Sequence, residues 1–253
     1  MLATERRRII ADLVTQHGRA EVTELSALLG VSRMTVRRDL NTLTSSGAIE
    51  RAWGGAVVQN IMLSTETPYA LKRRENEEVK RRIGQQAARL VGDGDVVILD
   101  AGSTTFHVAT QLRGKRDVTV VTNDLKIAVE LASFHSLTVI TAGGVLQHDS
   151  FTQLSPQTEE FFRGIHVNWA FLGADAVDLN HGVSTRTLQA VAVKQAMIEA
   201  ATEAILLVDH SKFDRHAFVR FCRIDDLTAL ITDRATPDDT LALLGDRLRV
   251  EVV

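Results

Sequence analysis

Between residues 96 and 252 the sequence alternates short apolar runs, rich in β-branched residues, with longer segments of helical character. The seven runs are 96–99, 118–121, 137–140, 169–172, 205–208, 229–231 and 248–252. Strands that alternate with helices are typical of a parallel sheet covered by helices. The pattern therefore predicts an α/β fold over residues 75–253, with a Rossmann-like, largely parallel sheet.

Polar and glycine-rich residues follow five of these runs, at 100–105, 122–124, 141–144, 173–175 and 209–212. Open α/β sheets bind ligands in the crevice outside the carboxyl ends of their strands, so these segments are expected to converge on one pocket. The candidate effector-binding residues are Asp100, Gly102, Ser103, Thr104, Thr105, Asn123, Gly143, Gly144, Asp175, Lys194 and Lys212.

The stretch from Gly102 to Thr105 suits a phosphate group. Backbone N–H groups at the start of a helix and short hydroxyls present hydrogen-bond donors to an anion, and Lys194 and Lys212 would add positive charge. Ordinary roles remain open for the same residues. Glycine and hydroxyl residues also form plain turns and helix caps, and a lysine on a helix also occurs as a solvated residue.

Three groups of apolar residues at helical spacing predict three helices in the first 45 residues. The groups are Ile9, Ile10, Leu13 and Val14; Val22, Leu25, Leu28 and Leu29; and Val36, Leu40 and Leu43. The first helix would end at His17-Gly18 and the second at Gly30, and Ser32 is placed to cap the third. Two helices joined by so tight a turn form a helix-turn-helix.

The third helix is predicted to turn a basic face outward. Arg33, Met34 and Arg37 would project from its first turns, where a recognition helix enters the major groove, because an arginine can form two hydrogen bonds to guanine. Residues 49–52 and 56–58 flank Trp53-Gly54-Gly55 and predict a hairpin, the wing. The candidate DNA-binding residues are Ser32, Arg33, Met34, Thr35, Arg37, Arg38 and Arg51. A plain solvated helix face is the alternative.

Charge and length support a division into a winged helix-turn-helix domain (1–58), a linker (59–74) and a larger α/β domain (75–253). Residues 1–60 carry eight arginines and six acids, whereas the whole chain has a net charge of −3. No apolar run approaches the ~20 residues of a membrane span, and no secretion signal is evident, so a cytoplasmic protein without membrane partners is expected. The single cysteine, Cys222, is expected to be a small buried apolar residue.

The decamer from Val31 to Leu40, followed by Gly47 and Gly54-Gly55, resembles the signature of the DeoR family of sugar-operon regulators. Family members commonly have a histidine where this chain has Trp53. The segments after the strands also match the C-terminal half of that family, which is similar to ribose-5-phosphate isomerase. The resemblance implies double-stranded operator DNA as a partner and a phosphorylated sugar or sugar acid as the effector.

An isomerase-like enzyme with a fused helical domain is the alternative function, and a protein-binding adaptor is a third. The isomerase's catalytic glutamate is replaced by Ala176, and its lysine-bearing glycine run is replaced by residues 181–186. Without an acid, base and lysine there, no catalytic residues are assigned. No cofactor and no metal site are expected, since the eight histidines lie scattered along the sequence.

The predicted function is therefore that of a transcriptional regulator, in the default case a repressor of a carbohydrate or sugar-acid catabolic operon. One winged domain reads few base pairs, so a homo-oligomer is expected, with the dimer and the tetramer both open.

Overall fold

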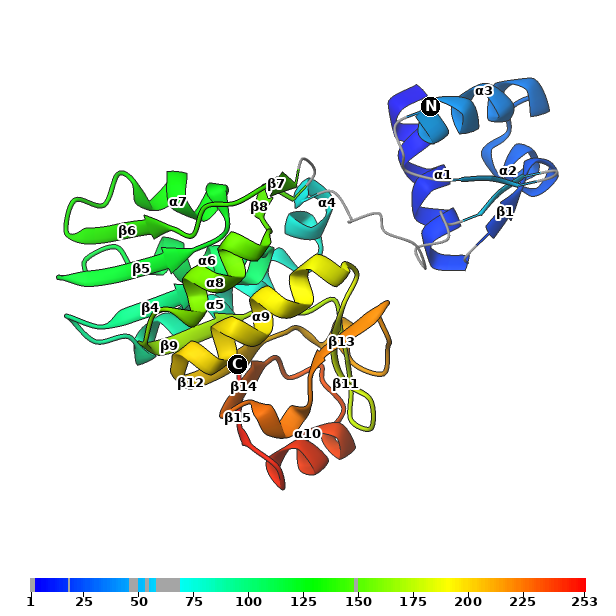
Figure 1. The fold of residues 1–253 in the computed structure, drawn as a ribbon. Helices are drawn as coiled ribbons and strands as arrows, with labels where there is room; N and C mark the ends of the chain where they lie inside the picture. Colours follow the sequence, from blue (N-terminus) through cyan, green and yellow to red (C-terminus); the bar gives the residue numbers. More distant parts are fainter. Residues whose placement is uncertain (1–2, 18, 46–49, 53–54, 58–68, 148–149) are drawn as a thin grey trace. The chain divides into compact units, whose positions relative to one another are not determined.

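The chain forms two units, Met1–Leu63 and Ser64–Val253. The computed structural model describes residues 3–17, 19–45, 50–52, 55–57, 69–147 and 150–253 (Figure 1). Gly18, Gly47, Trp53, Gly54 and most of the predicted linker lie outside these residues. Among the described helices, none is long and apolar enough to cross a membrane.

The described residues of the first unit form three helices and a small antiparallel sheet, as the sequence predicts for a winged helix-turn-helix. The helices are α1 (Ala3–His17), α2 (Val22–Leu29) and α3 (Arg33–Ser45), and the strands are β1 (Arg19–Glu21), β2 (Glu50–Ala52) and β3 (Gly55–Val57). The strand order is β1-β3-β2, so β1, which the sequence analysis did not predict, completes the sheet beside the wing. Ile10, Leu25, Val36 and Leu40 form its core at 2% exposure or less.

The turn between α2 and α3 has the predicted geometry. Gly30 ends α2 with φ 63°, a left-handed conformation that glycine adopts without steric cost. The Ser32 hydroxyl accepts a hydrogen bond from the Thr35 N–H at 3.1 Å, which confirms the cap. Leu28, which belongs to the apolar group that predicts this helix, is 66% exposed. Leu25 and Leu29 already occupy the inner side of this two-turn helix.

The second unit is built on a seven-stranded sheet whose neighbouring strands are all parallel. Its strands are β4 (Val96–Leu99), β5 (Val118–Thr122), β6 (Leu137–Thr141), β9 (Val167–Leu172), β12 (Ala201–Leu207), β14 (Ala229–Thr232) and β15 (Arg249–Val252). All seven predicted strands are present. The order β15-β14-β12-β9-β4-β5-β6 shows that the chain starts at β4, builds outward to β6, and returns to the other side of β4 with β9.

Helices cover both faces of this sheet (Figure 1). They are α4 (Tyr69–Arg74), α5 (Glu77–Leu90), α6 (Ser103–Gln111), α7 (Leu125–Leu131), α8 (Pro156–Arg163), α9 (Leu188–Ala200) and α10 (Asp238–Gly245), with short 3₁₀ turns η1 (His210–Lys212) and η2 (Ile224–Asp226). Val97 and Leu99 of β4 pack in the core with α5, α6 and α7, whereas Ile98 packs in the core with α8 and α9. This alternation explains why β4 is apolar throughout.

Two small antiparallel sheets complete the second unit. One has the order β10 (Ala176–Asp178), β11 (Gly182–Thr185), β13 (Val219–Cys222), and the other pairs β7 (Leu146–Gln147) with β8 (Thr152–Gln153). Cys222 is buried as expected, and burial raises the pKa of its thiol to about 12. Helix α4 lies within the stretch that the sequence analysis assigned to the linker.

Candidate nucleic-acid interface and ligand pocket

Helix α3 presents a basic outer face. Arg33, Met34, Arg37 and Arg38 are exposed, while Val36 and Leu40 on the opposite side are fully buried. The helix has one acidic residue, Asp39, which is 5% exposed and accepts a hydrogen bond from the Arg6 Nε of α1 at 2.6 Å. Its negative charge is therefore neutralised beneath the face that the three arginines form.

The other candidate DNA-binding residues lie around this face. Ser32 and Thr35 bond to each other in the first helical turn, with their hydroxyl oxygens 2.9 Å apart. Arg51 lies in β2, and its side chain is outside the described part of the structure. Asn41, exposed one turn after Arg37, extends the face and was not predicted. It is a candidate because an asparagine can pair with the edge of adenine.

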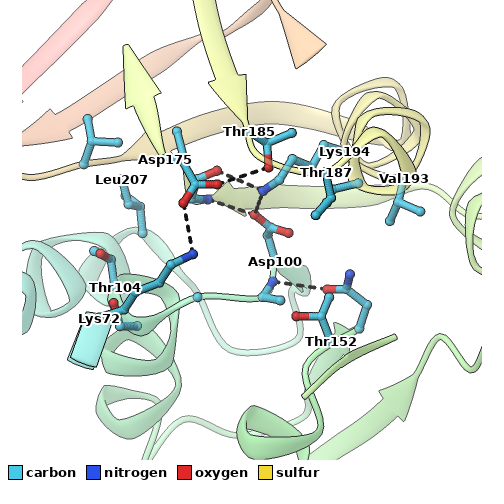
Figure 2. Close-up of a pocket in the computed structure, with 18 of the residues that line it drawn as sticks. Lys72, Asp100, Thr104, Thr152, Asp175, Thr185, Thr187, Val193, Lys194 and Leu207 are labelled. Atoms are coloured by element: carbon cyan, nitrogen blue, oxygen red, sulfur yellow. Dashed lines mark hydrogen bonds and ion pairs between the residues drawn. The ribbon is translucent and has the colours of Figure 1, made fainter. Parts of the chain in front are cut away.

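A cavity of about 80 Å³ lies at the carboxyl ends of the parallel strands (Figure 2). One water molecule takes about 10–15 Å³ of such volume, so the cavity has room for a phosphate group with several further atoms. Predicted residues that line it are Asp100, Gly102, Ser103, Thr104, Asn123, Asp175, Lys194 and Lys212. Segments that follow β4, β5, β9 and β12 thus meet at one site, as expected for this fold.

Lys194 of α9 is held by an ion pair inside the cavity wall. Its ammonium group donates to the Asp100 carboxylate and, at 2.9 Å, to the carbonyl oxygen of Gly173. Asp100 also accepts from the Gly173 N–H at 3.0 Å. Lys194 is 8% exposed and Asp100 is 2% exposed, so each neutralises the other with little exposure to solvent.

Asp175 pairs with cations from other elements, and Figure 2 shows its carboxylate joined to Lys72. The Lys72 Nζ of α4 lies 3.0 Å from one carboxylate oxygen, and the Arg186 Nε lies 3.6 Å from the same oxygen. The Thr185 hydroxyl donates to the other oxygen at 3.2 Å. Burial raises the pKa of Asp175, but Lys72 and Arg186 outweigh it and lower that pKa to about 2.

The first turn of α6 borders the cavity through Ser103 and Thr104. The first N–H groups of a helix have no carbonyl partner within the helix, so they can bind an anion. The Asn123 side-chain oxygen orients the loop before this turn by accepting from the Ala101 N–H at 3.1 Å. Asp124 accepts from the Gly102 N–H at 3.3 Å, and burial raises the pKa of Asp124 to about 6.

The α4–α5 segment contacts two of the loops that form the site. Besides the contact of Lys72 with Asp175, the Asn76 amide donates to the Asp209 carboxylate at 2.9 Å. The Lys80 ammonium, 2% exposed, donates to the carbonyl oxygens of Lys72 and Glu75, at 2.5 and 2.6 Å. Burial lowers the pKa of Lys80. Among the described atoms, the second Asp209 oxygen is buried without a hydrogen-bond partner.

Both units match models of one protein family. Residues 6–61 match the DeoR-like helix-turn-helix domain, and residues 75–234 match the DeoR C terminal sensor domain. The chain belongs to the DeoR family of transcriptional regulators. The sequence resemblance is therefore confirmed along with the fold, and the larger unit is the sensor domain.

Named relatives of this DeoR-family regulator are transcriptional regulators, and the sequence match covers nearly the whole length of each. The HTH-type transcriptional regulator GlpR of Haloferax volcanii is 35% identical over 95% of this chain and 93% of its own. The HTH-type transcriptional repressor GlcR of Bacillus subtilis is 33% identical over 100% and 96%, and the glycerol-3-phosphate regulon repressor of Escherichia coli is 31% identical over 97% of each chain. This regulator is accordingly a DNA-binding protein and not an isomerase.

Among solved structures, ribose 5-phosphate isomerase from Plasmodium falciparum resembles the regulator with a TM-score of 0.40 and 16% identity, covering 54% of this chain and 53% of that one.

Three of the predicted effector-binding residues do not line the cavity of the regulator. The Thr105 hydroxyl donates to the Gly102 carbonyl at 3.0 Å and so closes its own helical turn. The Gly143 carbonyl accepts from the Thr158 hydroxyl at 2.7 Å. Gly144 has φ 115°, and a Cβ there would lie 2.1 Å from the Thr158 oxygen, so this glycine permits close packing onto α8.

The cavity also contains residues that sequence reasoning missed: Lys72, Lys80, Thr152, Thr185 and Thr187. Lys72 and Lys80 belong to segments before the first strand of the sheet, and the threonines belong to short strands or loops, so no strand-end pattern marks them. With Lys194, Lys212 and the two aspartates included, the described lining has four lysines and two aspartates. The excess positive charge favours an anionic ligand.

Proposed function

We propose that this regulator represses a carbohydrate or sugar-acid catabolic operon and that a phosphorylated sugar or sugar acid in the sensor pocket changes its affinity for operator DNA. The main support is the placement of Lys72. This lysine lies in α4, the first described helix after the DNA-binding unit, and it also lines the pocket and pairs with Asp175.

The pocket chemistry suits a phosphate ester. The start of α6 offers N–H donors and the Ser103 and Thr104 hydroxyls, and Lys212 contributes positive charge to the lining. Hydroxyl groups of a sugar would find acceptors in the Asp100 and Asp175 carboxylates. A neutral sugar would gain nothing from the excess positive charge of the lining.

An anion in the pocket would compete with Asp175 for Lys72. Separation of this pair would remove one contact between the α4–α5 segment and the pocket loops, while the hydrogen bond from Asn76, which follows α4, to Asp209 would remain. A ligand shifts such an equilibrium only by its difference in affinity for the two states, and a change from 1:99 to 99:1 requires about 5.5 kcal/mol. Smaller differences give partial relief of repression.

On the DNA side, Arg33, Arg37 and Arg38 supply the base and phosphate contacts from α3, with the hairpin of β2 and β3 as the wing. The regulator acts as a homo-oligomer that places paired recognition helices on repeated half-sites. It works in the cytoplasm, where operator DNA and phosphorylated metabolites meet.

Binding-site selection tests the DNA-binding half of this proposal. Wild-type protein is incubated with random duplex DNA at fixed salt, and the bound sequences are recovered. We expect one enriched site, which Arg37→Ala loses and which Arg234→Ala, an exposed arginine of the sensor domain, retains. The absence of any enriched sequence would contradict the proposal.

A panel of sugar phosphates tests the effector half, with the affinity for the selected DNA site as the readout. One phosphate ester should change this affinity in the wild type and in Lys115→Ala, which lies outside the pocket lining, but not in Lys212→Ala. In Lys72→Met the same ester should still bind to the protein, whereas its effect on DNA affinity should shrink. An undiminished effect in both Lys212→Ala and Lys72→Met would refute the assigned pocket.

A further inference from the structure

Three potential metal ligands meet outside the effector pocket, although the sequence predicts no metal site. Asp178 and His181 stand at the two ends of the turn between β10 and β11, and His216 lies in the loop that follows η1. One ligand atom from each of them lies within 4.8 Å of the other two. The spacing of these residues in the sequence does not predict the group, because His216 follows His181 by 35 residues and only the fold brings it close to the other two ligands.

The contacts within the group fit a shared ion. The His181 Nδ1 lies 2.9 Å from one Asp178 oxygen, and the His216 Nε2 lies 3.7 Å from the other. The two imidazole rings stand edge to face with centroids 4.5 Å apart. Nitrogen ligands lie about 2.0–2.1 Å from Zn²⁺, so small rotations of two exposed rings would place one ion between them.

Asp178 is held in position by its backbone contacts. One of its oxygens accepts from the N–H groups of Asn180 and His181, both at 2.8 Å. The turn thus fixes one carboxylate oxygen and leaves the other directed toward His216. A ligand held in this way loses little conformational freedom when an ion binds.

We propose that Asp178, His181 and His216 bind a divalent transition-metal ion, with two imidazoles and one carboxylate as protein ligands and water at the remaining positions. This ligand set suits zinc, nickel, cobalt or iron rather than magnesium or calcium, which prefer oxygen ligands.

The bound ion would join two segments that also form the effector pocket. Asp178 ends the strand that directly follows Asp175, and His216 follows Lys212 by four residues. Val177 and Phe213 already form a parallel bridge between these segments. An ion would therefore fix the distance between two walls of the pocket, a consequence that rests on the proposed function, whereas the metal site itself does not.

Calorimetric titration of the full chain with Zn²⁺ alone tests the site. The sample for this titration should carry no affinity tag and should first be treated with a chelator, so that neither tag histidines nor residual metal ions contribute to the binding. We expect one high-affinity ion per chain and a higher melting temperature of the sensor domain with Zn²⁺, because an ion that binds only the folded state stabilises it. Co²⁺ in place of Zn²⁺ should show visible d–d bands that differ from those of the hydrated ion, because imidazole nitrogens replace water as ligands.

Substitutions of the ligands decide the assignment. His181→Asn and His216→Asn should each weaken Zn²⁺ binding by about tenfold or more, and both side chains are exposed, so the fold tolerates the change. Asp178→Asn retains an oxygen for the two turn hydrogen bonds and removes the charge. His135→Asn, at an exposed histidine elsewhere in the sensor domain, should bind as the wild type does. Absence of Zn²⁺ binding by the wild type, or undiminished binding by all three ligand variants, would overturn the proposal.

Discussion

Replacement of Lys194 by methionine tests whether this residue is a structural ion-pair partner. Lys194→Met keeps most of the length and the apolar stem of the side chain but removes the ammonium group from the Asp100 carboxylate and the Gly173 carbonyl. Asp100 is 2% exposed, so solvent screens its charge only weakly, although the Gly173 N–H still donates to it at 3.0 Å. Removal of one partner of a buried pair costs about 3–5 kcal/mol, and the remaining hydrogen bond places the expectation near 3 kcal/mol.

The matched variant removes both charges. Asp100→Asn combined with Lys194→Met leaves an amide that can still accept from Gly173, so we expect the loss of unfolding free energy to fall to about 1 kcal/mol. The double variant should therefore be about 2 kcal/mol more stable than Lys194→Met alone, and the single variant Asp100→Asn completes the cycle that yields the coupling energy of the pair.

Urea unfolding followed by tryptophan fluorescence measures these values. The chain has two tryptophans. In a Trp53→Phe background Trp169 of β9 reports on the sensor domain alone. A loss below about 1 kcal/mol for Lys194→Met, or a double variant less stable than the single one, would refute the description of this pair as buried and mutually neutralising.

Three further predictions concern packing and protonation. Gly84→Ala should cost about 1–3 kcal/mol of unfolding free energy, because a Cβ there would lie 2.6 Å from the His107 Cβ. The control Gly245→Ala, with open space around its Cβ, should cost nothing measurable in the same urea assay. In α2, Leu25→Ala should cost about 2–5 kcal/mol and Leu28→Ala less than about 0.5, since these side chains are 2% and 66% exposed; equal losses in thermal unfolding of the first unit would contradict this. Burial raises the pKa of Asp124 from 3.8 to about 6. Between these two pH values the native state therefore holds a proton that the unfolded state releases. The contribution of Asp124 to the free energy of unfolding should be lost as the pH rises from about 4 to about 6. Asp124→Asn should remove that part of the pH dependence in thermal unfolding, and an unchanged profile would argue against the raised pKa.

Sequence reasoning succeeded where one local pattern dictates the structure. The apolar strands, the Ser32 cap and the buried stripe of α3 all follow from residues within a few positions of one another. It failed where the structure depends on distant partners. Leu28 fits the helical pattern but lies outside the core. Which of the apolar residues of α2 are buried depends on how the other helices pack against it.

The same distinction applies to the pocket. The strand-end rule located Asp100, Asn123 and Asp175, since parallel strands bring their carboxyl ends to one edge. No such rule shows that Lys194 pairs with Asp100, 94 positions away, or that Lys72 enters from the helix before the sheet. The metal-ligand group around Asp178 escaped notice for the same reason.

The order of strands in the sheet has a consequence for synthesis of the protein. Among the described residues, the core of the first unit draws on positions from Ile9 to Leu43, so this unit can fold on the ribosome long before the sensor is complete. Strand β4 appears early, but its neighbour β9 and the lysine that neutralises Asp100 emerge much later. A nascent chain would therefore carry a folded DNA-binding unit before the sensor domain that controls it is complete, and a prematurely terminated chain would lack that control.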